Sequence, residues 1–192
     1  MPHDDFVYQT VSNGNGARQN SNMSEDDKIK IIQNAKDIDP NTFLQILEMD
    51  DDDDDREFSK GIVSQFFSQA EDKIIEMKEY VYEPSIPLAK YGTFLLNILL
   101  IYLFCYRKSQ DLVQLSSLGH FLKGSSATLG FTKIQEACEV IQHLGMGKDE
   151  SGHKVISDPQ ESLSQIQKKL DVMEADCQSV KSVLRNFYEA PL

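Results

Sequence analysis

The sequence is short of cysteine and of positive charge. Its three cysteines, Cys105, Cys138 and Cys177, are odd in number, widely spaced and outside any Cys-x-x-Cys or Cys/His pattern. This argues against a disulfide framework and a zinc site, so we expect no metal and a reducing intracellular compartment. Because 19 Lys and Arg stand against 31 Asp and Glu, the net charge is −12. We therefore expect no nucleic-acid partner, since binding to phosphates needs clustered cations.

Several recognisable segments are also missing. The first residues, MPHDDFVYQTVSNGNG, are polar and acidic and lack the basic and then apolar regions of a secretory signal. No Walker loop or kinase glycine-rich loop is present, so we expect the chain not to use ATP itself. No alternation of polar and apolar residues predicts a strand between the helical patterns. With 192 residues, 40% of them hydrophobic, the chain is long enough for one globular domain.

Apolar residues at spacings of three and four predict an all-α fold, most simply a four-helix bundle with a short leading helix. The bundle helices are expected in residues 56–82, around His120, in 131–145 and in 159–188, within a domain spanning 38–190. Residues 1–37 are rich in Asn, Ser, Gly and Asp. They are predicted to be a disordered N-terminal arm, in which DDKIKIIQNA is the only helix-like piece and a weak one.

The leading helix is expected in DIDPNTFLQILEM, with Asp39 as its N-cap and Pro40 in its first turn. Six aspartates, Asp50–Asp55, follow it. We interpret this run as a solvated loop. Its C-terminal end would also place carboxylates at the start of the next helix, where they offset the positive end of the helix dipole.

The stretch SSLGHFLKGSSATLGF, residues 116–131, combines a histidine, a lysine and a glycine on one side of a helix. At about 100° per residue, Lys123, Gly124 and Ala127 fall on the same side as His120. The opposite side carries a stripe of leucines, Leu115, Leu118, Leu122 and Leu129. His120 should therefore point outward, although a surface histidine is often only a solvated residue. A glycine such as Gly124 destabilises a helix by roughly 1 kcal/mol relative to alanine. Two explanations for its presence are access for a partner and close helix packing.

The motif LGHFLKGSSATLGF resembles the phosphorylation motif of the histidine-containing phosphotransfer (HPt) proteins, in particular the fungal phosphorelay intermediates. The resemblance continues upstream in EMDDDDDDREFSKG and downstream in ACEVIQHLG. It covers residues 40–83 and 109–145 well and the last helix by its apolar pattern. Residues 1–37 and 84–108 are not covered.

The resemblance implies a role for individual residues. His120 matches the phosphoacceptor, Lys123 the cation that helps to hold the phosphoryl group, and Gly124 the small residue that gives a receiver domain access. Gln142 matches the side chain that orients the imidazole. The receiver-docking surface would include Ile46, Met49, Phe58, Ile62 and Phe121. For Phe58 and Ile62, core packing is an equally good explanation, because both also fit the amphipathic stripe of their helix.

The implied function is that of a phosphorelay intermediate. His120 would accept a phosphoryl group from a receiver-domain aspartate of a hybrid histidine kinase and pass it to a response regulator, and the receivers would supply the Mg²⁺. The chain itself would need no cofactor and would show phosphotransferase activity only together with receiver domains. The resemblance also implies that the protein is a monomer and that it is found in the cytoplasm and nucleus. It further implies a role in osmotic or oxidative stress signalling. The alternative is a helical adaptor that binds receiver domains without carrying phosphate.

Residues 84–108 form an atypical apolar insertion. Its apolar core, Phe94 to Tyr106, is shorter than the roughly 20 residues of a membrane helix, so we expect no membrane span. An extra helix is one explanation. Another is that residues 91–107 are a retained intron, because Lys-Tyr-Gly and Tyr-Arg can be encoded as AAG-TAT-GG and TAC-AG, which would frame an in-phase intron. A spliced message that still encodes FLLNILLIYLF would contradict the intron explanation.

Overall fold

The computed structural model describes residues 23–51, 55–81 and 94–192, with only the backbone described for 94–101 and 103–110. Apart from an isolated bridge between Lys148 and Val155, the regular structure of these residues is helical, which confirms the all-α prediction. The helices are α1 (Glu25–Asn34), α2 (Pro40–Leu47), α3 (Glu57–Val81), α4 (Phe94–Thr128), α5 (Thr132–Gly145) and α6 (Pro159–Tyr188).

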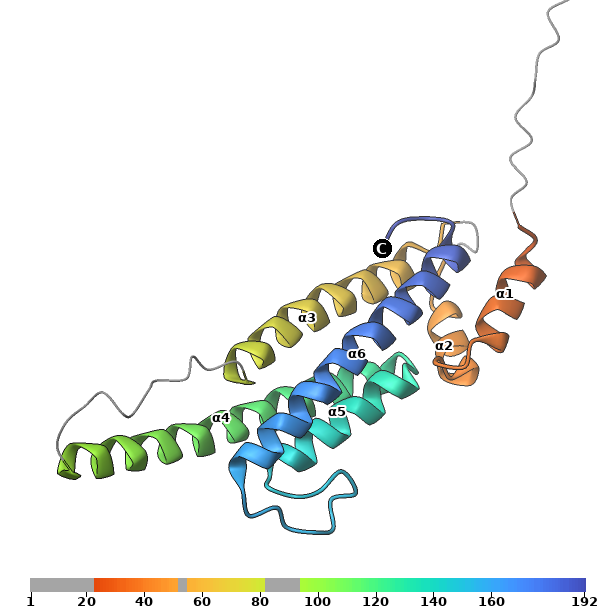
Figure 1. Ribbon diagram of the computed structural model, residues 1–192. Helices are drawn as coiled ribbons and strands as arrows, with labels where there is room; N and C mark the ends of the chain where they lie inside the picture. Colours follow the sequence, from red (N-terminus) through yellow and green to blue (C-terminus); the bar gives the residue numbers. More distant parts are fainter. Residues whose placement is uncertain (1–22, 52–54, 82–93) are drawn as a thin grey trace, which may run out of the picture.

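Helices α3, α4, α5 and α6 form the predicted four-helix bundle, and α1 and α2 lie together at one end of it (Figure 1). Each bundle helix turns an apolar stripe inward, as the spacing predicts, in α4 over the part from Leu112 onward. In α6 the predicted stripe is entirely buried, at Leu163, Ile166, Leu170, Met173, Cys177, Val180, Leu184 and Phe187. Asp158 caps α6 by accepting a hydrogen bond from the main-chain N–H of Gln160 at 2.9 Å.

An aromatic cluster fixes α2 against the bundle. The Phe131 ring, at the start of α5, lies 5.1 Å from Phe66 and 5.8 Å from Phe67 between ring centroids. Phe43 of α2 lies 6.3 Å from Phe131 and 6.1 Å from Phe187. Aromatic rings at these separations bury large apolar areas and favour a defined mutual orientation. The leading helix is therefore a fixed part of the domain.

The start of α2 is tied to the turn between α4 and α5. As predicted, Asp39 is the N-cap, and its carboxylate accepts hydrogen bonds from the main-chain N–H groups of Asn41 and Thr42 at 3.2 and 3.3 Å. The N–H of Asp39 donates to the carbonyl oxygen of Gly130 at 2.7 Å. Gly130 has a φ of +72°, in the left-handed region that favours glycine. These contacts hold α2 beside the end of the helix that carries His120.

The prediction of a disordered arm through residue 37 is wrong for residues 23–37. Ser24 caps α1, Ile32 is fully buried, and Lys28 forms an ion pair of 3.2 Å with Glu189 after α6. The local sequence pattern of this helix is weak, and its stability comes from packing against α6. Local sequence does not reveal such a contact. Residues 1–22 lie outside the described residues.

Asp50, the first residue of the aspartate run, contacts the next helix. The Asp50 carboxylate accepts a hydrogen bond from the N–H of Ser59 at 2.9 Å, in the first turn of α3. Asp50 thus adds a carboxylate at the start of α3 that the sequence reasoning did not assign, while Asp55 lies exposed two residues before the helix, where the expectation placed it. Asp51 is also exposed, in agreement with a solvated loop, whereas residues 52–54 lie outside the described residues.

The predicted insertion falls partly outside the described residues. Residues 84–93 are not described, and 94–108 form the beginning of α4, continuous with the turn that carries His120. This part of α4 extends beyond the rest of the bundle (Figure 1). Among the described residues, no helix is both long enough and apolar enough to span a membrane. The intron explanation stays a prediction.

Helices α4 and α5 approach each other closely at two glycines. A Cβ atom added to Gly145 would lie only 2.6 Å from the main-chain oxygen of Leu112 and 2.7 Å from the Cβ of Ser116. One added to Gly119 would lie 3.0 Å from the main-chain oxygen of Cys138. The Ser116 hydroxyl donates to the main-chain oxygen of Gln142 at 3.1 Å across the same contact. Only small residues permit this approach, which sets His120 beside α5.

We predict that Gly145→Ala lowers the free energy of unfolding by about 1–3 kcal/mol, because the new methyl group would overlap backbone atoms that cannot move independently. Gly124→Ala is the matched control: it should leave stability unchanged or raise it by up to about 1 kcal/mol. Urea unfolding followed by circular dichroism measures both. Equal stability of the two variants would contradict the close contact at Gly145.

Candidate functional site

The orientation of the His120 helix agrees with the sequence prediction. Leu115, Leu122 and Leu129 are buried in the core, and Leu118 is half-buried against it. His120 is exposed on the opposite side of α4. Burial of the leucine stripe thus fixes the rotation of the helix and presents the imidazole to solvent.

His120 shares a groove with Gln142 of α5. The groove has a volume of about 480 Å³ and is also lined by Val113, Ser116, Ser117, Gly145 and Met146. The Gln142 Oε1 atom is buried and has no hydrogen-bond partner within the described part of the chain. A buried acceptor without a donor is costly. The His120 imidazole lines the same groove and carries an N–H of the kind that this acceptor lacks.

Lys123 lies one turn from His120, and its ammonium group is already engaged by another side chain. It forms an ion pair with Glu139 of α5, with 2.7 Å between Nζ and Oε1. This hydrogen bond and the charge of Lys123 hold the pKa of Glu139 below its usual value. The predicted phosphoryl-binding cation therefore has a competing carboxylate that sequence reasoning missed. The spacing of Glu139 and Gln142, three residues apart and hence on one helix face, is the signal that could have revealed it.

Two helical glycines face open space, Gly124 one turn from the histidine and Gly61 in α3. A Cβ atom added to Gly124 would meet no atom within 4 Å, and the same is true of Gly61 in α3. Close helix packing therefore does not explain Gly124, which removes that alternative. Each glycine weakens its helix by about 1 kcal/mol relative to alanine. Gly61 was present in the FSKG motif but was assigned no role from the sequence, and it lies one turn from the exposed Phe58.

The predicted docking residues divide into exposed and buried side chains. Met49, Phe58 and Phe121 are 61%, 44% and 48% exposed, an unusual degree for large apolar side chains. Ile62 is half-buried against the core and lines a groove with Ser125 and Thr128 of α4. The assignment of Ile46 to this surface is wrong, because it is only 9% exposed and belongs to the core cluster. Its position at i+3 from Phe43 turns it inward with that residue.

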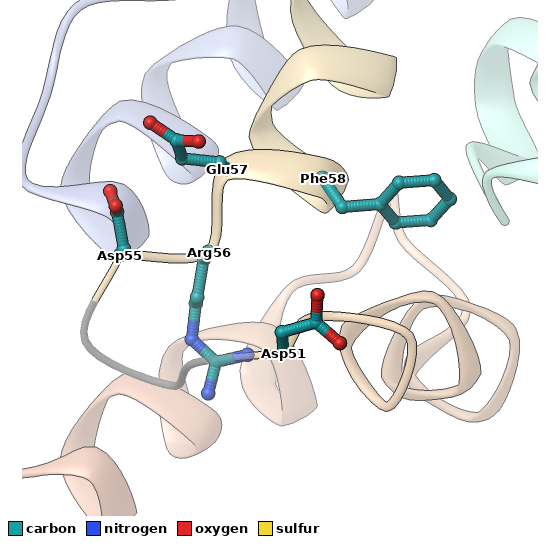
Figure 2. A pocket seen from close by; sticks show the side chains of 5 residues that line it. All are labelled: Asp51, Asp55, Arg56, Glu57 and Phe58. Atoms are coloured by element: carbon teal, nitrogen blue, oxygen red, sulfur yellow. The ribbon is translucent and has the colours of Figure 1, made fainter.

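An acidic rim lies next to the exposed Phe58. Asp51, Asp55 and Glu57 line a pocket of about 470 Å³ together with Arg56 and Phe58. In Figure 2 the Phe58 ring points away from Arg56. The Arg56 side chain is buried, contacts the carboxylate of Glu25 and lies 5.4 Å from the centroid of the Phe187 ring. Arg56 therefore secures the loop, while the carboxylates and Phe58 remain available to a partner.

The described side chains of His143, His153, Cys138 and Cys177 do not line the His120 groove, whereas His3 and the Cys105 side chain lie outside the described residues. The His143 Nδ1 atom is 3.1 Å from the carbonyl oxygen of Glu150, and His153 lies in the loop between α5 and α6. Burial raises the pKa of the Cys138 and Cys177 thiols to about 12. Thiols held in this way are poor nucleophiles. No group of three potential metal ligands occurs in the part of the chain that the structure describes.

Comparison with known protein families identifies the family of this chain. The family model described as the Hpt domain matches residues 61–183, which include α4 and α5 and most of α3 and α6. The chain belongs to the Hpt domain family. The matched region contains His120, Lys123, Gly124 and Gln142. Membership in the family agrees with the resemblance that the sequence motif indicates.

Two curated relatives are phosphorelay proteins. The multistep phosphorelay regulator 1 of Schizosaccharomyces pombe is 36% identical over 167 residues, which are 87% of this chain and 47% of the relative. The phosphorelay intermediate protein YPD1 of Candida albicans is 37% identical over 123 residues, covering 64% of this chain and 51% of the relative. The chain thus spans about half the length of the curated relatives it matches.

Solved Hpt structures share the fold. A crystal structure of yeast YPD1 matches with a TM-score of 0.60 and 25% identity, covering 82% of this chain and 97% of the other. A co-crystal structure of Saccharomyces cerevisiae Ypd1 with the receiver domain of the response regulator Ssk1 matches with a TM-score of 0.56 and 28% identity, with the same coverage.

We predict that Gly124→Gln slows phosphoryl transfer from a receiver to His120 by an order of magnitude or more, because about 1 Å of misplacement can cost a hundredfold. Gly124→Ala should transfer at close to the parent rate. Both should keep or raise the thermal midpoint, since both residues are better helix formers than glycine. Transfer rate and thermal midpoint are measured on the same preparations. Transfer by Gly124→Gln at the parent rate would show that open space at this position is not needed for access.

Proposed function

We propose that this chain is a phosphorelay intermediate. His120 accepts a phosphoryl group from a phospho-aspartate on the receiver domain of a hybrid histidine kinase and passes it to an aspartate of a response regulator. The observation that carries the proposal is the exposed His120 imidazole, which shares a groove with the unpartnered Oε1 of Gln142 and has open space at Gly124. Membership in the Hpt family and the phosphorelay relatives support it.

The groove suits a nucleophilic imidazole. In the reacting complex one ring nitrogen would donate its N–H to Gln142 Oε1, which has no partner in the described part of the free chain, so the other nitrogen would keep its lone pair for attack on phosphorus. The new phosphorus–nitrogen bond forms as the bond to the aspartate oxygen breaks, and the receiver recovers its carboxylate. The reverse exchange loads the second receiver. Because both steps exchange one activated phosphoryl bond for another, catalysis rests on positioning and charge.

The receivers complete the reaction site. We propose that they bring the Mg²⁺ and that the chain has phosphotransferase activity only in their presence, without ATP or a cofactor of its own. The exposed Met49, Phe58 and Phe121, with the half-buried Ile62, form the docking surface. Apolar side chains of this size, rimmed by the carboxylates of the α2–α3 loop, are typical of a protein-binding patch.

Three further properties are part of the proposal. The chain acts as a monomer, works in the cytoplasm and nucleus, and serves a pathway that responds to osmotic or oxidative stress. Light scattering of the purified chain tests the first, and fluorescence of a tagged chain in cells tests the second. Loss of stress tolerance on deletion, restored by the parent gene but not by a His120→Gln gene, tests the third.

We predict that His120→Gln abolishes labelling by a phosphorylated receiver while leaving helix content and the thermal midpoint close to those of the parent. The reason is that the exposed side chain makes no contribution to the buried leucine stripe. Incubation with a ³²P-labelled receiver domain and Mg²⁺ measures the transfer. His153→Gln is the matched control, because it removes an imidazole from an exposed loop position, and it should be labelled like the parent.

Two outcomes would contradict the proposal. Undiminished labelling of His120→Gln would remove His120 from the reaction. Binding of the phosphorylated receiver without any transfer of label to the parent would favour the adaptor alternative. A large loss of helix content in His120→Gln would instead assign the histidine a structural role.

A further inference from the structure

The ion pair between Lys123 and Glu139 lies beside the reacting histidine. Lys123 follows His120 by three residues, so the two side chains neighbour each other on α4. Glu139 precedes Gln142 by three residues on α5, so these two also share a face. The pair joins the two helices that form the His120 groove, with 2.7 Å between its charged atoms. Phosphorylation of His120 would place about two negative charges within reach of the same ammonium group.

The Lys123 ammonium group therefore has two competing anions. In the unphosphorylated chain it donates a hydrogen bond to the Glu139 carboxylate, and this contact keeps the pKa of Glu139 below its usual value and so favours the charged form. The side chains are 30% and 44% exposed, so the pair is screened by water and can exchange partners readily. A deeply buried pair could not be broken so easily.

We infer that Glu139 is a positioning residue that competes with the phosphoryl group of His120 for Lys123 and thereby limits the lifetime of the phosphohistidine. This inference rests on the proposed function. Lys123 stabilises the phosphoryl oxygens only to the extent that Glu139 releases it. A weakly held phosphoryl group passes more readily to the next receiver, which is what an intermediate in a relay requires.

A simpler explanation is that the ion pair only fastens α4 to α5. A fastening role would appear in the free energy of unfolding and not in the chemistry of the phosphorylated chain. The two helices are already held by the close contacts at Gly119 and Gly145 and by the hydrogen bond from Ser116 to Gln142. Loss of a partly exposed ion pair should therefore change stability little.

The test uses the isolated chain, phosphorylated on His120 with potassium phosphoramidate and freed of reagent. Loss of the phosphoryl group is followed by ³¹P NMR in the absence of any receiver, so that docking does not contribute. Glu139→Gln should lengthen the half-life of the phosphohistidine about two- to fivefold, the scale of one partly exposed ion pair. Glu136→Gln is the matched control, an exposed glutamate one turn away on α5, and should leave the half-life unchanged.

Two further variants show whether Lys123 mediates the effect. Lys123→Ala should shorten the half-life, and the double variant Lys123→Ala/Glu139→Gln should match Lys123→Ala alone. Glu139→Asp, which keeps the charge, should restore most of the parent behaviour. The thermal midpoints of all variants should stay close to that of the parent.

Equal half-lives of the parent, Glu139→Gln and Glu136→Gln would overturn the inference. An effect of Glu139→Gln that persists in full in the Lys123→Ala background would also overturn it, because the carboxylate would then act on the phosphoryl group directly. The proposed function fails separately, if a phosphorylated receiver does not label the parent chain. Because the half-lives are measured after chemical phosphorylation, the two failures are distinguishable.

Discussion

The close approach of α4 to α5 is the contact on which the site depends. At Gly145 and Gly119 the backbone of one helix touches the other, with no room for a methyl group at Gly145. This contact brings His120 and Gln142, which are far apart in the sequence, to the walls of one groove. The outer side of α4 has the opposite property, since Gly124 faces open space. Glycines thus serve packing on one side of the histidine and access on the other.

The features that follow local rules could be predicted from the sequence. The leucine stripe fixed the outward direction of His120 because burial of one helix face determines the opposite face. Asp39 and Asp158 followed the capping rules that satisfy the first N–H groups of a helix. The HPt motif added Gln142, whose position beside His120 no local pattern indicates. These predictions rest on contacts within one helix or on a family pattern that already contains the tertiary contact.

The features that depend on long-range packing could not be predicted. Helix α1 has a weak local signal and is held by Ile32 and by the ion pair from Lys28 to the end of the chain. Ile46 is apolar and near the docking surface, but its burial is decided by how α2 sits on the bundle. Glu139 was assigned no role from the sequence, although its spacing from Gln142 places both on one helix face. Only the relative placement of α4 and α5 brings Glu139 to Lys123.

The central claim is that His120 carries a phosphoryl group delivered by a receiver domain. The most direct measurement is to incubate the chain with a phosphorylated receiver and Mg²⁺, digest it at alkaline pH, and locate the phosphate by ³¹P NMR and peptide mass spectrometry. The account predicts a single acid-labile phosphoramidate on the peptide that contains His120. A phosphate on any other residue, or a stable complex with the receiver in which the chain remains unphosphorylated, would contradict it.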